Sequence, residues 1–309
     1  RALSITLLCR LMFLYFVQRK GWLDGDPGFM AALVLDPAAE SVYEERLRPL
    51  FFDALNRPPD RRGSGPRYRG VPFLNGGLFA PSEAEQRNPN ATLDDAVVRA
   101  LVDAVLERYR FVEREDIDGE VAVDPEMLGC VFEQLMCDEQ RTRTGAFYTP
   151  PSLVHDPVDL ALATLMECRV GAETWAAVER RDTIDSRTCT EVVAARDDLR
   201  ILDPAVGTGA FLLGALQRLV DCRAHLQPGL PRAELARRIV GRNLYGVDIS
   251  ATAVTLCELR LWLAVAAEMS DGPGAHVQPL PNLSHHVRRG NVLTGTSVFA
   301  AFEGVPVPP

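Results

Sequence analysis

The feature that most constrains the fold is a strand–turn–helix pattern that occurs twice in the second half of the chain. The first copy has an apolar run over 199–202, which ends at Asp203 in a glycine-containing turn, and a helical stretch over 210–220. The second copy spans 243–267, with Asp248 at the end of its apolar run. Strands that alternate with helices are typical of a parallel sheet with right-handed crossovers. The pattern therefore predicts an α/β fold.

The first 140 residues show apolar residues at helical spacing instead. Helices are predicted over 2–20, from about Thr92, and after Asp124-Pro125, where an N-cap residue precedes a first-turn proline. An arginine-rich stretch over 57–69, interrupted by proline and glycine, predicts an exposed loop. We therefore expect a mainly α-helical region over 1–140 and an α/β region over 141–309.

The composition excludes several classes of protein. The chain has 33 basic and 42 acidic side chains and a formal net charge of −9, which is not the balance of a non-specific polyanion binder, although a local basic face could contact DNA. The seven cysteines include no Cys-x-x-Cys pair, and the five histidines show no metal-ligand spacing. We expect no metal site, and we expect His285 and His286 at the surface.

Location and one enzyme class are also constrained by the sequence. No apolar stretch near the start is long enough to span a bilayer, so we expect no membrane association. The scattered cysteines fit reduced thiols, so we expect a cytoplasmic protein. The only lysine is Lys20, and no acidic residue precedes it. A metal-dependent nuclease site with an acid-x-Lys element is therefore not expected within these residues.

The turn that follows Asp203 is the most informative segment. Gly207 and Gly209 lie between a strand end and a helix start, where glycine lets the backbone approach a ligand closely. The dinucleotide-binding fingerprint requires a third glycine where Leu212 stands, so that fingerprint is absent. An acidic residue at the strand end would repel a phosphate group. The turn therefore favours a cationic ligand.

Asp248 ends the second strand and is followed by Ile249. A carboxylate in this place can accept both hydrogen bonds of a ribose diol, and the next apolar side chain can cover an adenine ring. Taken alone, Asp248 would be read as a surface or capping residue. Together with the glycine turn one strand earlier, it favours ribose binding.

Four segments in fixed order resemble one enzyme family. They are Gly-Ala-Phe-Tyr-Thr-Pro (145–150), Asp-Pro-Ala-Val-Gly-Thr-Gly-Ala-Phe-Leu (203–212), Tyr-Gly-Val-Asp-Ile (245–249) and Gly-Asn-Val-Leu (290–293). This series resembles the S-adenosylmethionine-dependent DNA adenine N6 methyltransferases. The similarity is to the large type IIG-like restriction–modification and phage-defence branch, BREX-like or DISARM-like. The resemblance extends over nearly the whole chain.

The resemblance implies a Rossmann-like class I methyltransferase domain with S-adenosylmethionine as its cofactor. Thr149 would contact the methionine carboxylate of the cofactor, although Pro157 would kink the helix that follows it. Asp203 and the turn with Ala205, Gly207 and Gly209 would face the cationic methionine portion.

The same resemblance assigns the nucleoside portion of the cofactor to the next two strand ends. Asp248 would bind the ribose hydroxyls, and Ile249 would pack on the adenine ring. Asn291 would accept a hydrogen bond from the exocyclic amine, and Val292 would line the same ring.

The family's catalytic loop, Asn-Pro-Pro-aromatic or Asp-Pro-Pro-aromatic, does not occur in the sequence. In the family this loop holds the amine of an adenine that is flipped out of double-stranded DNA. We therefore expect a fragment whose sheet is truncated before its fourth strand, with no catalytic residues of its own and with most DNA contacts in other segments. The alternative is a non-catalytic methyltransferase-fold module that serves as a binding or structural partner. Methylation of a protein glutamine or an RNA base is disfavoured by the resemblance.

Overall fold

The computed structural model describes residues 2–62, 68–74, 77–88, 93–108, 149–272 and 277–294. The chain forms two compact units, Arg1–Leu128 with Met269–Asn282, and Gly129–Glu268 with Leu283–Pro309. The predicted boundary after residue 140, the predicted helix after Asp124-Pro125 and the segment 145–148 lie outside the described residues.

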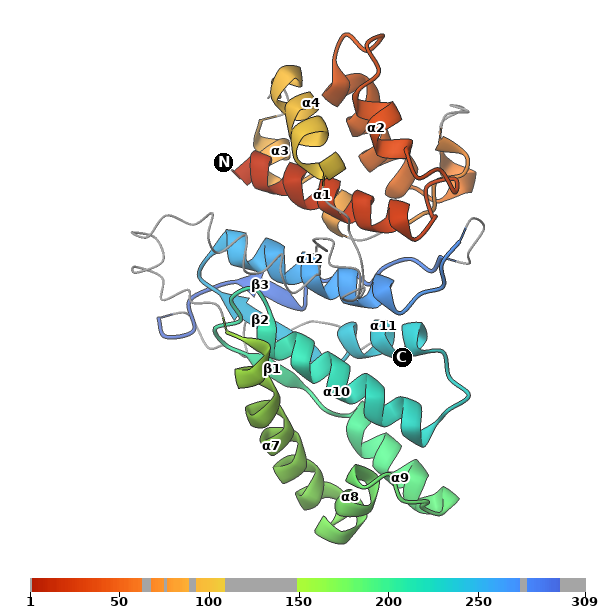
Figure 1. The fold of residues 1–309 in the computed structure, drawn as a ribbon. Helices are drawn as coiled ribbons and strands as arrows, with labels where there is room; N and C mark the ends of the chain where they lie inside the picture. Colours follow the sequence, from red (N-terminus) through yellow and green to blue (C-terminus); the bar gives the residue numbers. More distant parts are fainter. Residues whose placement is uncertain are drawn as a thin grey trace. The chain divides into compact units, whose positions relative to one another are not determined.

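The first unit is helical, and its core forms around α1 (Ala2–Arg19), which confirms the helix predicted over 2–20. Phe79 packs against both Phe13 and Phe51, with ring centroids 5.9 and 6.1 Å apart. The stretch after α1 contains several short helices (Figure 1). The further helices of this unit are α2 (Phe29–Val34), η1 (Tyr43–Leu47), η2 (Leu50–Leu55), η3 (Pro59–Arg61), η5 (Gly77–Phe79), α3 (Glu83–Arg87), α4 (Asp95–Ala104) and η6 (Leu106–Arg108).

In the loop predicted over 57–69, not every arginine side chain is exposed and free of hydrogen bonds. Arg62 donates hydrogen bonds to the carbonyl oxygens of Tyr68 and Val71 at 3.2 and 2.7 Å, which closes the stretch on itself. Residues 63–67 lie outside the described part of the chain. The arginines of this stretch are therefore not all available to a phosphate backbone.

Residues 269–282 return to the helical unit, which local sequence patterns did not indicate. The indole Nε1 of Trp22 donates to the carbonyl of Ser270 at 3.0 Å, and the Gly272 amide donates to the carbonyl of Lys20 at 2.7 Å. The Lys20 ammonium is buried and forms an ion pair with Asp271 at 2.6 Å. The single lysine therefore has a structural role.

The second unit is an α/β structure with a parallel three-stranded sheet in the order β1-β2-β3 (Figure 1). Within its register, Asp203 lies opposite Gly246, and Asp248 lies opposite Arg289. Among the described residues, β1 pairs with β2 alone. The strands are β1 (Ile201–Asp203), β2 (Leu244–Asp248) and β3 (Val287–Arg289). The helices are α7 (Pro151–Val170), α8 (Ala172–Glu179), α9 (Ser186–Asp197), α10 (Ala210–Leu226), α11 (Arg232–Val240) and α12 (Ala251–Ala267).

These elements confirm the α/β prediction and both strand–turn–helix copies. The predicted helix over 251–267 corresponds to α12, and α10 continues to Leu226, beyond the predicted end at 220. Helix α11 packs against both α10 and α12, and α7 packs on α10. The last contact is close, because a Cβ on Gly214 would lie 2.5 Å from a methyl group of Val154. Pro157 lies inside α7, as expected.

The expectation that both adjacent histidines lie at the surface was wrong for His286. Its ring stacks on Tyr245 with centroids 4.8 Å apart, and its Nδ1 lies 3.0 Å from the carbonyl oxygen of Leu244. Burial lowers the pKa of His286. The cause is the pairing of β3 with β2, which carries His286 over Tyr245, whereas His285 stays exposed.

Two features are absent from the residues that the structure describes. No helix in this part of the chain has the length and apolar character needed to cross a membrane. Within the same residues, no group of three or more His, Cys, Asp or Glu side chains is arranged to hold a metal ion.

Candidate functional site

The turn between β1 and α10 contains two glycines with left-handed backbone conformations. Gly207 has φ +52° and Gly209 has φ +90°, which other residues adopt only with strain. A Cβ on Gly209 would lie 2.7 Å from Sγ of Cys257 on α12, so packing also requires glycine there. A Cβ on Gly207 would have no heavy atom within 4 Å. Gly209 therefore shapes the turn, and Gly207 leaves open space above it.

Three interactions attach this turn to the second strand. The Val206 amide donates to the carbonyl of Val247 at 2.9 Å, and the Gly207 amide donates to Oδ2 of Asp248 at 2.9 Å. The side chain of Val206 occupies the space beside Gly246, where a Cβ would lie 2.9 Å from it. The ends of β1 and β2 are thereby joined into one structure, with a carboxylate as the connecting group.

Helix α12 supports the turn from the protein interior through Arg260, a residue that the sequence analysis missed. Its Nη1 donates to the carbonyl and to Oγ1 of Thr208 at 3.0 and 3.1 Å, and the side chain is 4% exposed. A charged residue in the apolar run Leu-Arg-Leu-Trp (259–262) was the available signal. Charge-assisted hydrogen bonds of this kind are stronger than neutral ones, so the turn is held rigidly.

One carboxylate oxygen of Asp203 is buried and unpaired in the part of the chain that the structure describes. Oδ1 accepts a hydrogen bond from the Ala205 amide at 3.0 Å, whereas Oδ2 is buried and has no partner among the described residues. Burial raises the pKa of Asp203, and the nearby Asp248 carboxylate raises it further. An unpaired buried acceptor beside a second carboxylate favours a ligand that carries positive charge and N–H donors.

Asp248 has spare hydrogen-bonding capacity on both oxygens. Oδ2 accepts from Gly207, and Oδ1 accepts from the Ser250 amide at 2.7 Å, so each oxygen retains one lone pair. The adjacent Ile249 is 50% exposed. Two free acceptor positions next to an exposed aliphatic side chain can bind a diol and an attached ring.

The segment after β3 approaches the same sheet edge. The Gly290 amide donates to the carbonyl of Asp248 at 2.9 Å, which places Asn291 beside the second strand end. Asn291 is exposed, and its Oδ1 accepts from the Leu293 amide at 3.0 Å, so one lone pair of that oxygen is already used. Val292 is half-buried.

Thr149 is connected to this edge less directly than the other predicted site residues. It is half-buried and lies just before α7, which packs on α10. The structure thus brings together at one edge the strand-end and turn residues, which are Asp203, Ala205, Gly207, Gly209, Asp248, Ile249 and Asn291.

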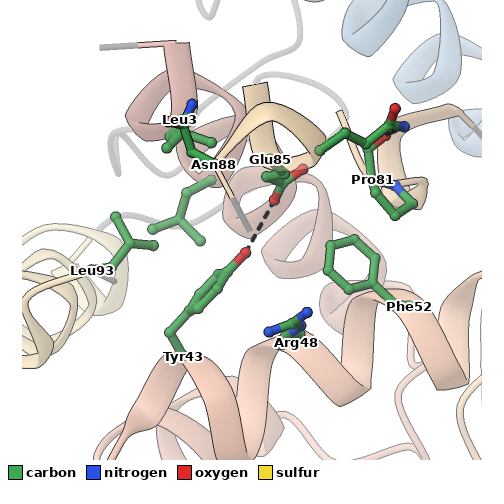
Figure 2. Close-up of a pocket in the computed structure, with 10 residues that line it drawn as sticks. Leu3, Tyr43, Arg48, Phe52, Pro81, Glu85, Asn88 and Leu93 are labelled. Carbon is green, nitrogen blue, oxygen red and sulfur yellow. Dashed lines mark hydrogen bonds between the residues drawn. The ribbon is translucent and has the colours of Figure 1, made fainter. Parts of the chain in front are cut away.

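A separate cavity of about 200 Å³ lies in the helical unit, between α1, α3, η1 and η2 (Figure 2). Figure 2 shows the Tyr43 hydroxyl directed at Glu85, to which it donates at 3.0 Å. Glu85 also accepts hydrogen bonds from the buried Arg10 guanidinium at 2.6 and 3.0 Å and from Ser82. The Arg10 contacts hold the pKa of Glu85 at about 2, and burial beside Glu85 raises the pKa of Tyr43 to about 12. The carboxylate of this cavity is therefore committed to holding the helices together.

Comparison with known proteins supports one broad family. No family model matches the chain. The chain is 30% identical over 325 aligned positions to a Methanocaldococcus jannaschii protein named as a type II restriction enzyme and methyltransferase. The alignment covers 94% of this chain and 27% of that protein. It is 37% identical over 71 positions to the adenine-specific methyltransferase PglX of Streptomyces coelicolor, across 23% of this chain and 6% of PglX.

Among solved structures, the fold is similar to that of the type IIL restriction–modification enzyme MmeI, which was determined in complex with DNA. The TM-score is 0.65 at 19% identity, over 94% of this chain and 37% of the MmeI chain. The chain thus spans about a quarter of its Methanocaldococcus relative and little more than a third of MmeI. The Methanocaldococcus and Streptomyces relatives support a methyltransferase of the restriction–modification type, and MmeI supports the fold alone.

Proposed function

We propose that this chain binds S-adenosylmethionine at the carboxyl ends of β1 and β2, as the cofactor-binding part of a DNA adenine N6 methyltransferase. The enzyme would serve restriction–modification or a BREX-like or DISARM-like phage defence. The observation that carries the proposal is the joined strand ends. There the Gly207 amide donates to Asp248, and Oδ2 of Asp203 is buried with no hydrogen-bond partner among the described residues.

The chemical groups at this edge fit the cofactor. The unpaired oxygen of Asp203 suits the ammonium of the methionine portion, and the nearby carboxylates favour the positive sulfonium. Asp248 retains an acceptor position on each oxygen for the ribose diol, and exposed Ile249 offers an apolar surface to adenine. The open space above Gly207 allows close approach of the ligand. The cofactor supplies an activated methyl group, and these residues hold and orient it.

Thr149, Asn291 and Val292 complete the proposed site. Val292 and the remaining lone pair of Asn291 would meet the adenine ring, since this segment follows the hydrogen bond between Gly290 and Asp248. Thr149 would reach the methionine carboxylate from the start of α7.

We propose double-stranded DNA as the partner of the whole enzyme. The support is the DNA complex of MmeI and the adenine specificity in the name of PglX. A net charge of −9 means that DNA must be contacted through local basic surfaces rather than through the overall field of this chain.

Isothermal titration calorimetry with S-adenosylmethionine tests the proposal. We expect binding at one site, weakened at least tenfold in Asp203→Asn and in Asp248→Ala. Asp198→Ala is the matched control, because Asp198 is an exposed carboxylate of the same unit whose only hydrogen bond described is with Arg169. Tight binding that survives both site substitutions would refute the proposal, as would an absence of binding to a folded wild-type chain.

A further inference from the structure

Ile249 lies in the short connection between β2 and α12, outside both elements. The carbonyl of Asp248, at the start of this connection, accepts a hydrogen bond from the Gly290 amide at 2.9 Å. The next carbonyl, that of Ile249, accepts one from Nε of Arg289 at 3.1 Å. At the far end, the side chain of Ser250 caps the first turn of α12. Arg289 and Gly290 therefore hold two consecutive carbonyl groups beside the proposed cofactor site.

Arg289 reaches the connection because of the register of the sheet. It ends β3 and lies opposite Asp248, the last residue of β2. The chain passes close to β2 directly after this position, since a Cβ on Gly290 would lie 3.1 Å from a methyl group of Val247. The pairing of the two parallel strands thus brings a side-chain N–H to the peptide that follows β2.

The contacts of Arg289 indicate little contribution to the stability of the fold. Within the described part of the chain, Arg289 forms no ion pair, and its polar contact is the hydrogen bond to Ile249. The side chain is exposed, and substitutions at exposed positions usually change the unfolding free energy very little. The contact therefore acts on the position of Ile249 more than on the stability of the unit.

The direction of the Ile249 side chain follows from its backbone. Isoleucine is branched at Cβ, which restricts rotation about χ1, so the peptide that carries the side chain largely sets where the side chain points. Packing does not fix it fully, because half of the side chain is exposed. A hydrogen bond that holds the carbonyl of Ile249 therefore also holds its apolar surface.

We infer that Arg289 is a positioning residue for the nucleoside end of the cofactor site. Its Nε–H holds the peptide of Ile249, so that the apolar side chain is already in place when the adenine ring arrives. A contact that is in place before binding loses less conformational entropy on binding. This inference rests on the proposed function, and it assigns the effect to the N–H donor of Arg289 and not to the positive charge.

Two substitutions separate the donor from the charge. Arg289→Gln places an amide nitrogen at the same number of bonds from Cα as Nε and removes the charge, whereas Arg289→Met removes both. In isothermal titration calorimetry, Arg289→Met should bind S-adenosylmethionine about three- to tenfold more weakly, which is the effect of losing one hydrogen bond. Arg289→Gln should stay within about twofold of the wild type. Arg187→Met, a change at an exposed arginine of α9, is the matched control and should leave the affinity unchanged.

A double-mutant cycle shows whether Arg289 acts through Ile249. Ile249→Ala removes the side chain that Arg289 is inferred to position, so the addition of Arg289→Met should weaken binding no further. An equal loss from Arg289→Met with and without the Ile249 side chain would overturn the inference. So would wild-type affinity in Arg289→Met, or an Arg289→Gln variant that binds as weakly as Arg289→Met.

Hydrogen exchange of the free chain gives a readout that needs no cofactor. The amides of residues 249 and 250 should exchange faster in Arg289→Met than in the wild type, and Arg289→Gln should exchange like the wild type. Unchanged exchange in Arg289→Met would overturn this inference alone. A folded wild-type chain that binds no S-adenosylmethionine would instead refute the proposed function, and the role of Arg289 in binding with it.

Discussion

Replacing Asp248 by alanine tests the structural connection on which the site depends. The carboxylate accepts two backbone hydrogen bonds, from Gly207 at 2.9 Å and from Ser250 at 2.7 Å. A hydrogen bond to a charged group contributes about 1.5–3 kcal/mol, so losing both at this partly exposed position should cost about 3 kcal/mol. For a unit of this size the melting temperature should fall by about 6–12 °C. Asp248→Asn keeps one acceptor oxygen and should lose about half as much.

Differential scanning calorimetry of these variants beside Asp198→Ala checks the magnitude. Asp198 is 77% exposed, and its substitution should change the unfolding free energy by no more than about 0.5 kcal/mol. If Asp248→Ala melted within about 1 °C of the wild type, the carboxylate would not fasten the turn to β2, and the reasoning about the joined strand ends would be refuted.

Three further predictions concern single residues. Asp203→Asn should weaken cofactor binding but keep or raise the melting temperature at neutral pH. Burial raises the pKa of Asp203, so the ionised carboxylate lowers the stability of the folded chain at that pH. A clear fall in the melting temperature would contradict this. Gly209→Ala should destabilise by about 2–4 kcal/mol in urea unfolding, since its Cβ would lie 2.7 Å from Cys257 Sγ at φ +90°, and Cys257→Ala in the same chain should recover part of the loss. Glu85 has a pKa of about 2 in the folded chain, whereas the pKa of a glutamate in an unfolded chain is about 4.3. Its carboxylate should therefore stabilise the helical unit fully at a pH above about 4.3, and this contribution should be lost as the pH falls toward 2. Urea midpoints between pH 6 and pH 3 should therefore fall less steeply in Glu85→Gln, and equal slopes would count against the assignment.

Local patterns were sufficient for the elements that position the candidate site. Both strand ends, the glycine turn and α12 follow from apolar runs and from the residues that end them, which act over a few positions. The sequence predicts only that Asp248 and the glycine turn lie close together. It does not predict the hydrogen bond from the Gly207 amide to Asp248, because a side-chain hydrogen bond across 41 positions depends on the register of the sheet.

The features that sequence patterns did not predict depend on contacts between distant segments. His286 is buried because β3 pairs with β2, and Arg260 is buried because α12 lies behind the turn. Arg10 was expected only as part of an apolar helix, yet it reaches carbonyls and a carboxylate about seventy positions away. In each case a polar residue is buried because its partner comes from another part of the chain, which no local pattern specifies.

A crystal structure of the chain with S-adenosylhomocysteine, the product form of the proposed cofactor, tests the central claim most directly. We predict that the ribose hydroxyls lie within hydrogen-bond distance of the Asp248 carboxylate and that the amino group of the ligand approaches Oδ2 of Asp203. A ligand bound away from the carboxyl ends of β1 and β2 would contradict the account, as would ligand-soaked crystals in which this edge of the sheet holds only water.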